Sequence, residues 1–209
     1  MQSSLCQTCR RSGIKLFLKG ERCVTAKCAI IKRHDPPGPR KKRRPAPLSE
    51  YGKQLREKQK LKNWYNLREQ QLSNYVKAAL KKRGSSEDPI VLLIKTLEGR
   101  LDNVIFRLGF AISRKMAKQM VTHGLFLVNG KPANIPSYQV KKSDIVSAKA
   151  AKIKKSIFQK ISGQLKKHKA PSWLELNAEK WEGKVVSDPI ADTAELPAEI
   201  SSIFEFYSR

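Results

Sequence analysis

Four cysteines stand close together near the start of this 209-residue chain, and cysteine occurs nowhere else in it. They form two pairs, Cys6-x2-Cys9 and Cys23-x4-Cys28, which are separated by thirteen residues. Each pair can place two thiolates on one metal ion, and two such pairs complete the tetrahedral four-sulfur shell of a structural zinc site. Sulfur then fills every position, and no open position remains for a substrate. The spacing therefore predicts a structural zinc ion held by Cys6, Cys9, Cys23 and Cys28.

Two other interpretations of the cysteines stay open at this point. Disulfide bonds would need an oxidising compartment, and no signal-peptide pattern precedes Cys6, so we expect a cytoplasmic protein with reduced thiols. Four unligated thiols would leave the first thirty residues, whose apolar content is small, with little to hold them together. Neighbouring bases such as Arg10, Lys19 and Arg22 are expected to favour the thiolate form, and hence metal binding.

The charge of the chain is strongly positive and unevenly placed. Lysine and arginine number 43 against 18 acids, which gives a formal net charge of +25. Residues 170–209 carry eight acids and three bases, so they are net negative, whereas the preceding residues carry the whole excess of bases. This distribution predicts a polyanionic partner for the basic body. The acidic stretch from Asp188 to Glu205 is expected to face protein, because its carboxylates would be repelled by phosphate.

One predicted helix, residues 114–123, presents bases on one side only. Its apolar residues share the other side, Ser113 is a good N-cap and Gly124 a good residue for the helix end. A short hairpin should follow, with Asn129-Gly130 as its turn, because both residues tolerate positive φ. We expect RNA contacts from the helix face, the hairpin tip and the preceding helix, because these bases are poor core residues: Arg107, Arg114, Lys115, Lys118 and Lys131.

Further bases precede this region. Arg40, Lys41, Lys42, Arg43 and Arg44 form an uninterrupted run between prolines, which keep it extended. A solvated linker is the plain interpretation, but an extended cationic strand also follows a phosphate backbone well, and we expect RNA contact there. Lys53 and Arg56 are interleaved with apolar positions on the helix that Ser49 should begin, and both are expected to contact RNA. The aromatic residues at helical spacing are expected in the core.

The remaining pattern predicts an α+β fold. Helices are expected at 49–65, 67–83, from Pro89, over 100–108 and, rich in lysine, over 148–168; strands are expected at 125–128, 145–147, 173–176 and 184–187. We expect a zinc knuckle and basic arm (1–47), a helical domain (48–96, completed by 190–209) and a mixed α/β domain (97–189) with a small antiparallel sheet and an RNA-binding module at 97–147.

Several motifs carry a family resemblance. RLDNVIFRLGFA, the Lys-Gln pair before Val121, His123-Gly124, VNGK and IPSY resemble the alpha-L RNA-binding module. CQTC, LKGERC, PPG, SEYGKQLREKQKLKNWYN, PSWLEL and FEFYSR extend the resemblance over almost the whole chain, and in this order they resemble the family of bacterial small-subunit ribosomal protein four. The chain departs from that family at Lys118, where an arginine is usual. Within the matching motifs and the adjoining helix, we add these residues as predicted RNA contacts: Arg100, Gln119, His123, Ser137 and Tyr138.

The resemblance implies a structural constituent of the small ribosomal subunit that binds the 5′ domain of small-subunit ribosomal RNA and nucleates assembly. It also implies a place beside small-subunit proteins five and three, near the path by which messenger RNA enters, with an influence on translational accuracy. It supports structural zinc with four cysteine ligands, although some members of that family lack the cysteines. We expect no membrane and no small-molecule substrate as partners, and an organellar origin stays open.

The sequence does not point to an enzyme. It contains no GxxxxGK[ST], HExxH or GxGxxG motif, and His123 at a helix end is a better RNA contact than a general base. The alpha-L module also occurs on RNA-modifying enzymes, but those attach it to a large catalytic domain for which this chain has little room. A free regulatory RNA-binding protein would account for the module, yet not for the cysteine arm or FEFYSR. Sedimentation with ribosomes would separate these classes.

Overall fold

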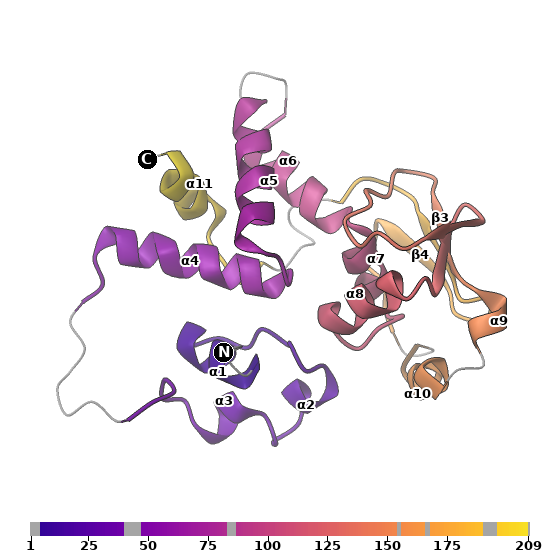
Figure 1. The fold of residues 1–209 in the computed structure, drawn as a ribbon, viewed down its shortest axis with the longest axis horizontal. Coiled ribbons are helices and arrows are strands. Elements are labelled where there is room, and N and C mark those ends of the chain that lie inside the picture. The colour runs from indigo at the N-terminus through magenta and orange to yellow at the C-terminus, as the bar shows by residue number, and fades with distance from the viewer. Residues whose placement is uncertain are drawn as a thin grey trace. The chain divides into compact units, whose positions relative to one another are not determined.

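The computed structural model describes residues 5–39, 47–82, 87–153, 156–165, 168–189 and 196–208. The chain divides into two compact units (Figure 1). Unit 1 comprises Met1–Ile90 with Leu196–Arg209, and unit 2 comprises Val91–Glu195. Helices dominate the described part of unit 1, and unit 2 combines helices with an antiparallel sheet. This confirms the predicted α+β class.

The longest helix of unit 1 begins directly after Ser49, the N-cap that the sequence predicts. The Ser49 hydroxyl accepts a hydrogen bond from the backbone N–H of Gly52 at 3.3 Å and so caps the first turn. Leu61 is fully buried on the inner side of that helix. The helices that make up unit 1 are α1 (Leu5–Ser12), α2 (Glu21–Val24), α3 (Ala29–Lys32), α4 (Glu50–Trp64), α5 (Glu69–Lys81) and α11 (Ile200–Ser208).

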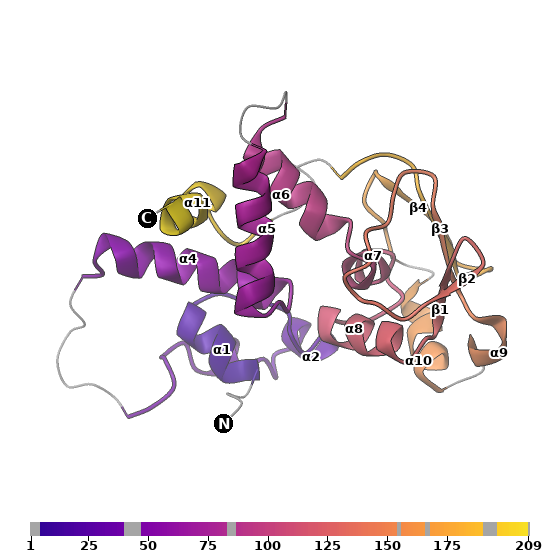
Figure 2. The same cartoon turned by 45° about the horizontal axis from the view of Figure 1, so that its top comes forward.

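The C-terminal helix α11 packs on α4 and α5, and Figures 1 and 2 both show it beside α4. Lys58 on α4 is the centre of this contact, because its Nζ lies 4.2 Å from the centre of the Phe206 ring and 2.6 Å from a carboxylate oxygen of Glu69. The Tyr207 hydroxyl donates to the same carboxylate oxygen, Oε1 of Glu69, at 3.1 Å. A buried lysine is therefore compensated by both an aromatic face and an anion.

The cysteine segment forms the short helices α1, α2 and α3 around a small core of its own. Cys9, Leu16, Cys28 and Ile30 are buried there, and Trp64 of α4 packs against them. Sequence reasoning predicted a metal knuckle here but none of these helices, because each is too short to show a clear apolar period.

Three helices lead into the sheet of unit 2: α6 (Pro89–Glu98), α7 (Leu101–Arg107) and α8 (Arg114–Thr122). The predicted limits of α8 are confirmed, since the Ser113 hydroxyl accepts from the Met116 N–H at 3.3 Å and Gly124 has φ of 60°. At the start of α6, the Asp88 carboxylate accepts from the Ile90 N–H at 2.9 Å. Local capping chemistry therefore sets where α6 and α8 begin.

The sheet has five antiparallel strands in the order β2-β1-β3-β5-β4. Its predicted hairpin is confirmed, with Asn129 and Gly130 at φ of 50° and 76°. Two predictions were inaccurate: β5 begins two residues earlier than expected, and the helix expected from residue 148 begins only at Ala150, because Ala148 belongs to β3. The elements are β1 (Phe126–Val128), β2 (Lys131–Ala133), β3 (Ile145–Ala148), α9 (Ala150–Ile153), α10 (Ser156–Leu165), β4 (Leu174–Asn177) and β5 (Glu182–Val185).

The core of unit 2 lies where α7, α8 and α10 meet the sheet. Its aromatic residues form a connected group, in which the ring centres of Phe110 and Phe126 lie 6.0 Å apart and those of Phe158 and Trp181 5.1 Å apart. Gly183 of β5 faces Leu108, and a Cβ at that glycine would lie 2.4 Å from the leucine methyl groups. Close packing of this kind holds α7 and α8 rigidly on the sheet.

In the parts of the chain that the structure describes, no helix combines the length and the apolar character needed to cross a membrane.

Candidate nucleic-acid interface

Helix α8 has one face in the core and one face open to solvent. Ala117, Met120 and Val121 are buried, whereas Lys115, Gln119 and His123 are exposed and Lys118 is half-buried. In the described residues Lys115 forms no ion pair, so its charge is not neutralised within the chain. The face that the sequence predicted as cationic is therefore present and accessible. Whether these side chains contact RNA remains a prediction.

The tip of the hairpin that follows this helix in the chain is held by several hydrogen bonds. Asn129 donates from its side-chain amide to Asp144 at 2.8 Å and accepts from the Ile145 N–H at 2.9 Å. Its own N–H donates to the Ile145 carbonyl at 2.8 Å. Lys131 follows the turn and is exposed. The tip thus presents a lysine from a backbone whose position is fixed by three hydrogen bonds.

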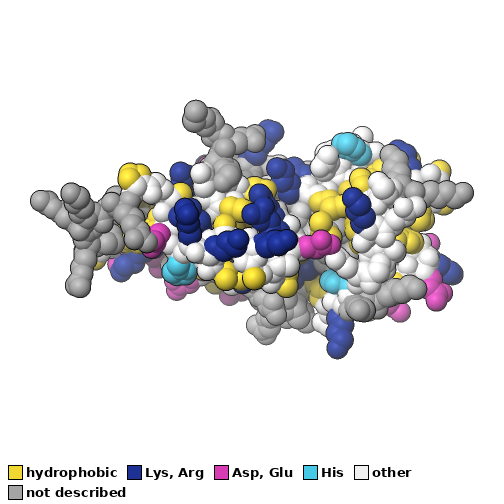
Figure 3. All heavy atoms as spheres, turned by 90° about the horizontal axis from the view of Figure 1, so that it is seen from below, with side chains coloured by type: hydrophobic (Ala, Val, Ile, Leu, Met, Phe, Trp, Pro, Cys, Tyr) yellow, Lys and Arg dark blue, Asp and Glu magenta, His cyan; other side chains and the backbone are white. Residues whose placement is uncertain are grey.

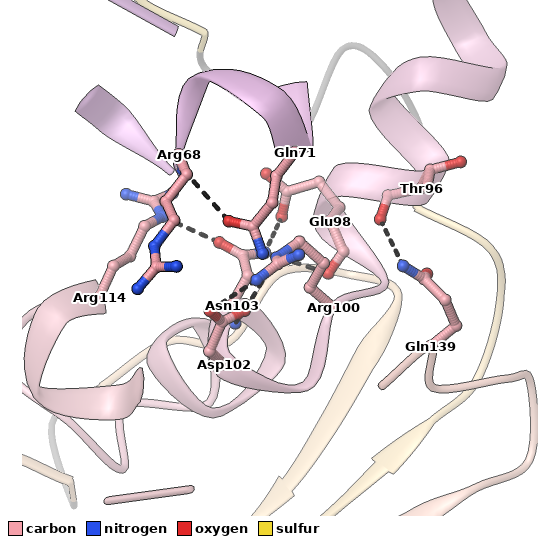
Figure 4. A network of polar contacts seen from close by, with 9 residues as sticks. All are labelled: Arg68, Gln71, Thr96, Glu98, Arg100, Asp102, Asn103, Arg114 and Gln139. Atoms are coloured by element: carbon pink, nitrogen blue, oxygen red, sulfur yellow. Dashed lines mark hydrogen bonds and ion pairs between the residues drawn. The ribbon is translucent and has the colours of Figure 1, made fainter. Parts of the chain in front are cut away.

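The loop after β2 holds the predicted contacts Ser137 and Tyr138. The Leu101 N–H at the start of α7 donates to the Tyr138 carbonyl at 2.9 Å. The Gln139 amide donates to the Thr96 carbonyl of α6 at 3.2 Å (Figure 4). Ser137 is half-buried, and the ring of Tyr138 is 42% exposed. The backbone is fastened to α6 and α7, so Tyr138 offers its ring from a fixed position.

A buried polar network joins α6, α7 and α8. Glu98 is 1% exposed, and its carboxylate accepts from Arg107 Nε at 3.0 Å, from Arg107 Nη2 at 2.9 Å and from Asn103 Nδ2 at 2.8 Å. The other end of the Asn103 amide accepts from Arg114 Nε at 2.9 Å (Figure 4). The Arg114 guanidinium also lies 4.5 Å from the centre of the Phe106 ring. These bonds fix the first residue of α8 to α7, and hence the direction of its exposed face.

A second buried pair stands next to this network. Arg100 is 1% exposed, and its Nε and Nη2 donate to the two carboxylate oxygens of Asp102, each at 3.1 Å. Burial raises the pKa of Asp102 above its usual range, and the charges of Arg100 and Lys118 oppose that shift. This bidentate pair holds Arg100, in the short connection between α6 and α7, against the first turn of α7.

These observations correct part of the sequence reasoning. Arginine was expected to be a poor core residue, but Arg114 is only 7% exposed and Arg107 is bound to a buried glutamate. Arg100 is buried as well. A guanidinium can enter a core when a planar acceptor satisfies its donors, and Glu98, Asp102 and Asn103 supply such acceptors. The structure therefore gives these three arginines internal partners, while Lys115 and Lys131 remain at the surface.

One base that sequence reasoning did not single out lies near the end of α8. A Cβ built at Gly124 would lie 3.9 Å from the Nζ of Lys149, and the Lys149 backbone N–H donates to the Leu125 carbonyl at 2.9 Å. Lys149 thereby adds a cation beside His123. In the sequence Lys149 lies in the expected lysine-rich helix over 148–168, and nothing local there reveals a neighbour 25 residues away.

In unit 1 the predicted contacts lie on α4. Lys53 is exposed and paired with Glu50 at 2.6 Å. Arg56 is exposed and lines a groove of about 270 Å³ between α1 and α4, together with Arg11, Gln59 and other polar residues. The predicted contacts from Arg40 to Arg44 lie outside the described residues. Lysine and arginine outnumber acidic side chains on the face drawn in Figure 3.

The four cysteines lie around one small cavity of about 20 Å³. All four are free thiols; Cys9, Cys23 and Cys28 are each 8% exposed, and Cys6 is half-buried. The Lys19 N–H donates to the sulfur of Cys23 at 3.4 Å. In the described segments, however, no group of three or more histidine, cysteine or acidic side chains has the geometry of a metal site. The zinc site stays a prediction.

The neighbouring bases were expected to favour the thiolates, and for Cys9 the structure shows the opposite balance. Burial raises the pKa of the Cys9 thiol, a backbone hydrogen bond at Leu16 lowers it, and the other three cysteines raise it further. The other three thiols act on Cys9 because all four line the same small cavity.

Two regions of the chain match known domain families. Residues 1–98 match the Ribosomal protein S4/S9 N-terminal domain, and residues 99–146 match the S4 domain. The chain is 45% identical to the small ribosomal subunit protein uS4 of Thermodesulfovibrio yellowstonii over 206 residues, which cover 99% of this chain and 97% of the relative. It is 46% identical to the protein of the same name from Halothermothrix orenii over 205 residues, or 98% and 97% of the two chains.

A third relative, the small ribosomal subunit protein uS4 of Caldicellulosiruptor saccharolyticus, is 46% identical over 204 residues, covering 98% of this chain and 96% of that one. The fold and the exposed basic helix thus belong to a protein in which an S4 domain follows a ribosomal N-terminal domain along the chain. The chain belongs to the family of the small ribosomal subunit protein uS4. This is a family of structural proteins, in agreement with the prediction that the chain is not an enzyme.

Proposed function

We propose that this protein is a structural component of the small ribosomal subunit in the cytoplasm and that it binds ribosomal RNA directly. The observation that carries the proposal is the exposed face of α8 with the fixed hairpin tip, which presents Lys115, Gln119, His123 and Lys131 from one rigid core. The names of its relatives support the same assignment. The net charge of +25 provides the long-range attraction.

Binding would depend mainly on charge and shape. An RNA helix hides its base edges in a deep, narrow groove, so proteins contact chiefly its phosphates and 2′-hydroxyl groups. The ammonium groups of Lys115, Lys118 and Lys131 suit phosphates, and the Gln119 amide and the Ser137 hydroxyl suit 2′-hydroxyls. The exposed ring of Tyr138 offers a surface on which an unpaired base can stack. The buried Glu98 network would act by keeping α8 at the angle that this surface needs.

The finer assignments rest on the resemblance and on the charge distribution. We propose the 5′ domain of the small-subunit ribosomal RNA as the binding site, with roles in early assembly and translational accuracy. Small-subunit proteins five and three are proposed as neighbours, and messenger RNA as a nearby strand where it enters the subunit. The acidic C-terminal segment supports protein neighbours, although Asp188 also pairs with Lys95 at 2.8 Å and Glu205 accepts from Gln54 at 2.9 Å inside the chain.

The test measures the affinity of the full chain for a transcript of the 5′ domain of small-subunit ribosomal RNA. Reversing two charges of α8, Lys115→Glu with Lys118→Glu, should weaken binding at least tenfold, because two attractive contacts become repulsive. The matched control is Lys180→Glu, an exposed lysine in the turn between β4 and β5. If the α8 variant and the control bind the RNA with equal affinity, α8 is not part of the interface.

Zinc held by Cys6, Cys9, Cys23 and Cys28 is the second part of the proposal. The residues fit the ion in kind, because four thiols surround one cavity and a backbone N–H already donates to the Cys23 sulfur, as second-shell donors do at metal sites. When bound, zinc would join α1 to α2 and α3 by coordination bonds and would supply no catalytic chemistry.

The zinc proposal predicts about one equivalent of zinc in protein purified without chelators, measured by elemental analysis. The double variant Cys23→Ser with Cys28→Ser should lose the metal, while circular dichroism still shows the helices of residues 48–209. Protein that contains no zinc after growth and purification with added zinc would contradict the proposal. Cooperative loss of all helices on chelation would show instead that the segment is not separable from the rest.

A further inference from the structure

A cavity of about 480 Å³ opens on unit 2 beside the start of α8. One wall comes from the end of α7 and the loop that follows, with Phe106, Arg107 and Ile112. The opposite wall comes from the end of α10 and the segment after it, with Gln164, His168 and Lys169. Its volume lies within the range of about 300–1,000 Å³ usual for ligand pockets. No residue of this cavity other than Arg107 was among the predicted contacts.

The walls of the cavity are fixed by a contact that only glycine permits. Gly109 has φ of +80°, and a Cβ there would lie 2.6 Å from Cδ2 of His168. The imidazole therefore lies directly against the glycine, and its Nε2 is 2.7 Å from the carbonyl oxygen of Arg107. That carbonyl belongs to the last residue of α7, where helix carbonyls lack partners within the helix. His168 thus closes the end of α7 and holds the two walls together.

The cavity combines an apolar surface with polar groups at its edge. Phe106, Ala111, Ile112 and Pro171 provide the apolar part, and the Phe106 ring is held in place by the Arg114 guanidinium at 4.5 Å. Gln164 and Lys169 provide an amide and an ammonium group, both exposed to solvent. An unpaired nucleotide has the matching parts, since its base is flat and apolar on its faces, its edge forms hydrogen bonds and its phosphate is an anion.

We propose that this cavity takes one unpaired nucleotide of the RNA that the α8 face binds, with the base against the apolar wall and the phosphate near Lys169. The inference rests on the proposed RNA binding and adds to it a second kind of contact. Ile112, which lines the cavity, directly precedes the N-cap Ser113, so the cavity lies next to the first turn of α8, which carries Lys115. The contact would read an unpaired position, which the lysines of α8 cannot do.

The test compares two glutamines of the same helix in the full chain. Gln164→Trp places an indole into the cavity from an exposed position, whereas Gln159→Trp places the same group on α10 at a position that does not line it. Affinity for a transcript of the 5′ domain of small-subunit ribosomal RNA should fall roughly five- to 100-fold in the first variant, the usual effect of losing one base-stacking contact. The second variant should match the original protein.

Two further measurements distinguish the loss of the base contact from the loss of a phosphate contact. Lys169→Ala, which removes the proposed phosphate contact, should lower the slope of log affinity against log salt by roughly 0.7–0.9, whereas Gln159→Trp should leave the slope unchanged. Chemical probing of the bound RNA should show one unpaired base that is protected by the original protein and by Gln159→Trp but reactive with Gln164→Trp. Tight, salt-dependent binding that Gln164→Trp does not weaken would overturn this inference and leave the proposed function standing. Absence of binding by the original protein would contradict the proposed function itself.

Discussion

Removal of the buried carboxylate of Glu98 is the perturbation for which the structure gives the most definite expectation. The side chain is 1% exposed, and its carboxylate accepts two hydrogen bonds from Arg107 and one from Asn103. Glu98→Ala removes the carboxylate that pairs with Arg107, whose side chain is only 16% exposed. Breaking a buried ion pair from one side costs roughly 3–5 kcal/mol. We expect about 3 kcal/mol, because Arg107 retains some access to water.

A loss of about 3 kcal/mol is a large part of the 5–15 kcal/mol that usually stabilises a domain. For a unit of roughly 100 residues it lowers the melting temperature by roughly 10–25 °C. Urea unfolding followed by tryptophan fluorescence can measure it, because two of the three tryptophans, Trp173 and Trp181, lie in unit 2. A Trp64→Phe background removes the third, so that the signal reports unit 2 alone.

Two variants complete this experiment. Glu179→Ala removes an exposed glutamate in the turn between β4 and β5 and should change stability by no more than about 0.5 kcal/mol. Glu98→Ala with Arg107→Met removes both charges and should recover part of the loss, since a buried pair replaced by apolar groups is often neutral. The reasoning is refuted if Glu98→Ala is as stable as Glu179→Ala, or if the double variant is less stable than Glu98→Ala.

Three other predictions follow from the same structure. Gly183→Ala should destabilise unit 2 by about 1–3 kcal/mol because its Cβ would meet Leu108, whereas Gly163→Ala, with open space on α10, should be neutral or stabilising by up to about 1 kcal/mol; urea unfolding compares them. Lys58→Ala should increase hydrogen exchange in α11 more than Lys53→Ala does, since only Lys58 contacts the Phe206 ring. RNA affinity should fall steeply with salt, and a log-log slope near zero would contradict phosphate binding.

The elements that could be predicted are those whose signals are local. Ser113 and Ser49 cap their helices through bonds to residues three positions ahead, and Asn129-Gly130 turns the chain because both residues accept positive φ. The short helices α1, α2 and α3 were missed because four to eight residues show too little of a period. The start of β5 was misplaced because Gly183 in its middle looks like a turn residue until Leu108 is seen packed against it.

By itself the sequence determined the α+β class, the limits of α8, the hairpin and the excess of positive charge, because caps, turns and periodicity act between near neighbours and charge needs no fold to be counted. Only the tertiary structure decided which bases face solvent. Arginine, lysine and histidine look alike as surface residues in a sequence, yet Arg100 and Arg114 are buried with Asp102 and Asn103, while Lys115 stays exposed. Which bases are buried depends on the cost of desolvating each charge and on the partners that the fold brings to it. The cavity at Gly109 and His168 likewise forms only because two residues 59 positions apart in the chain come into contact.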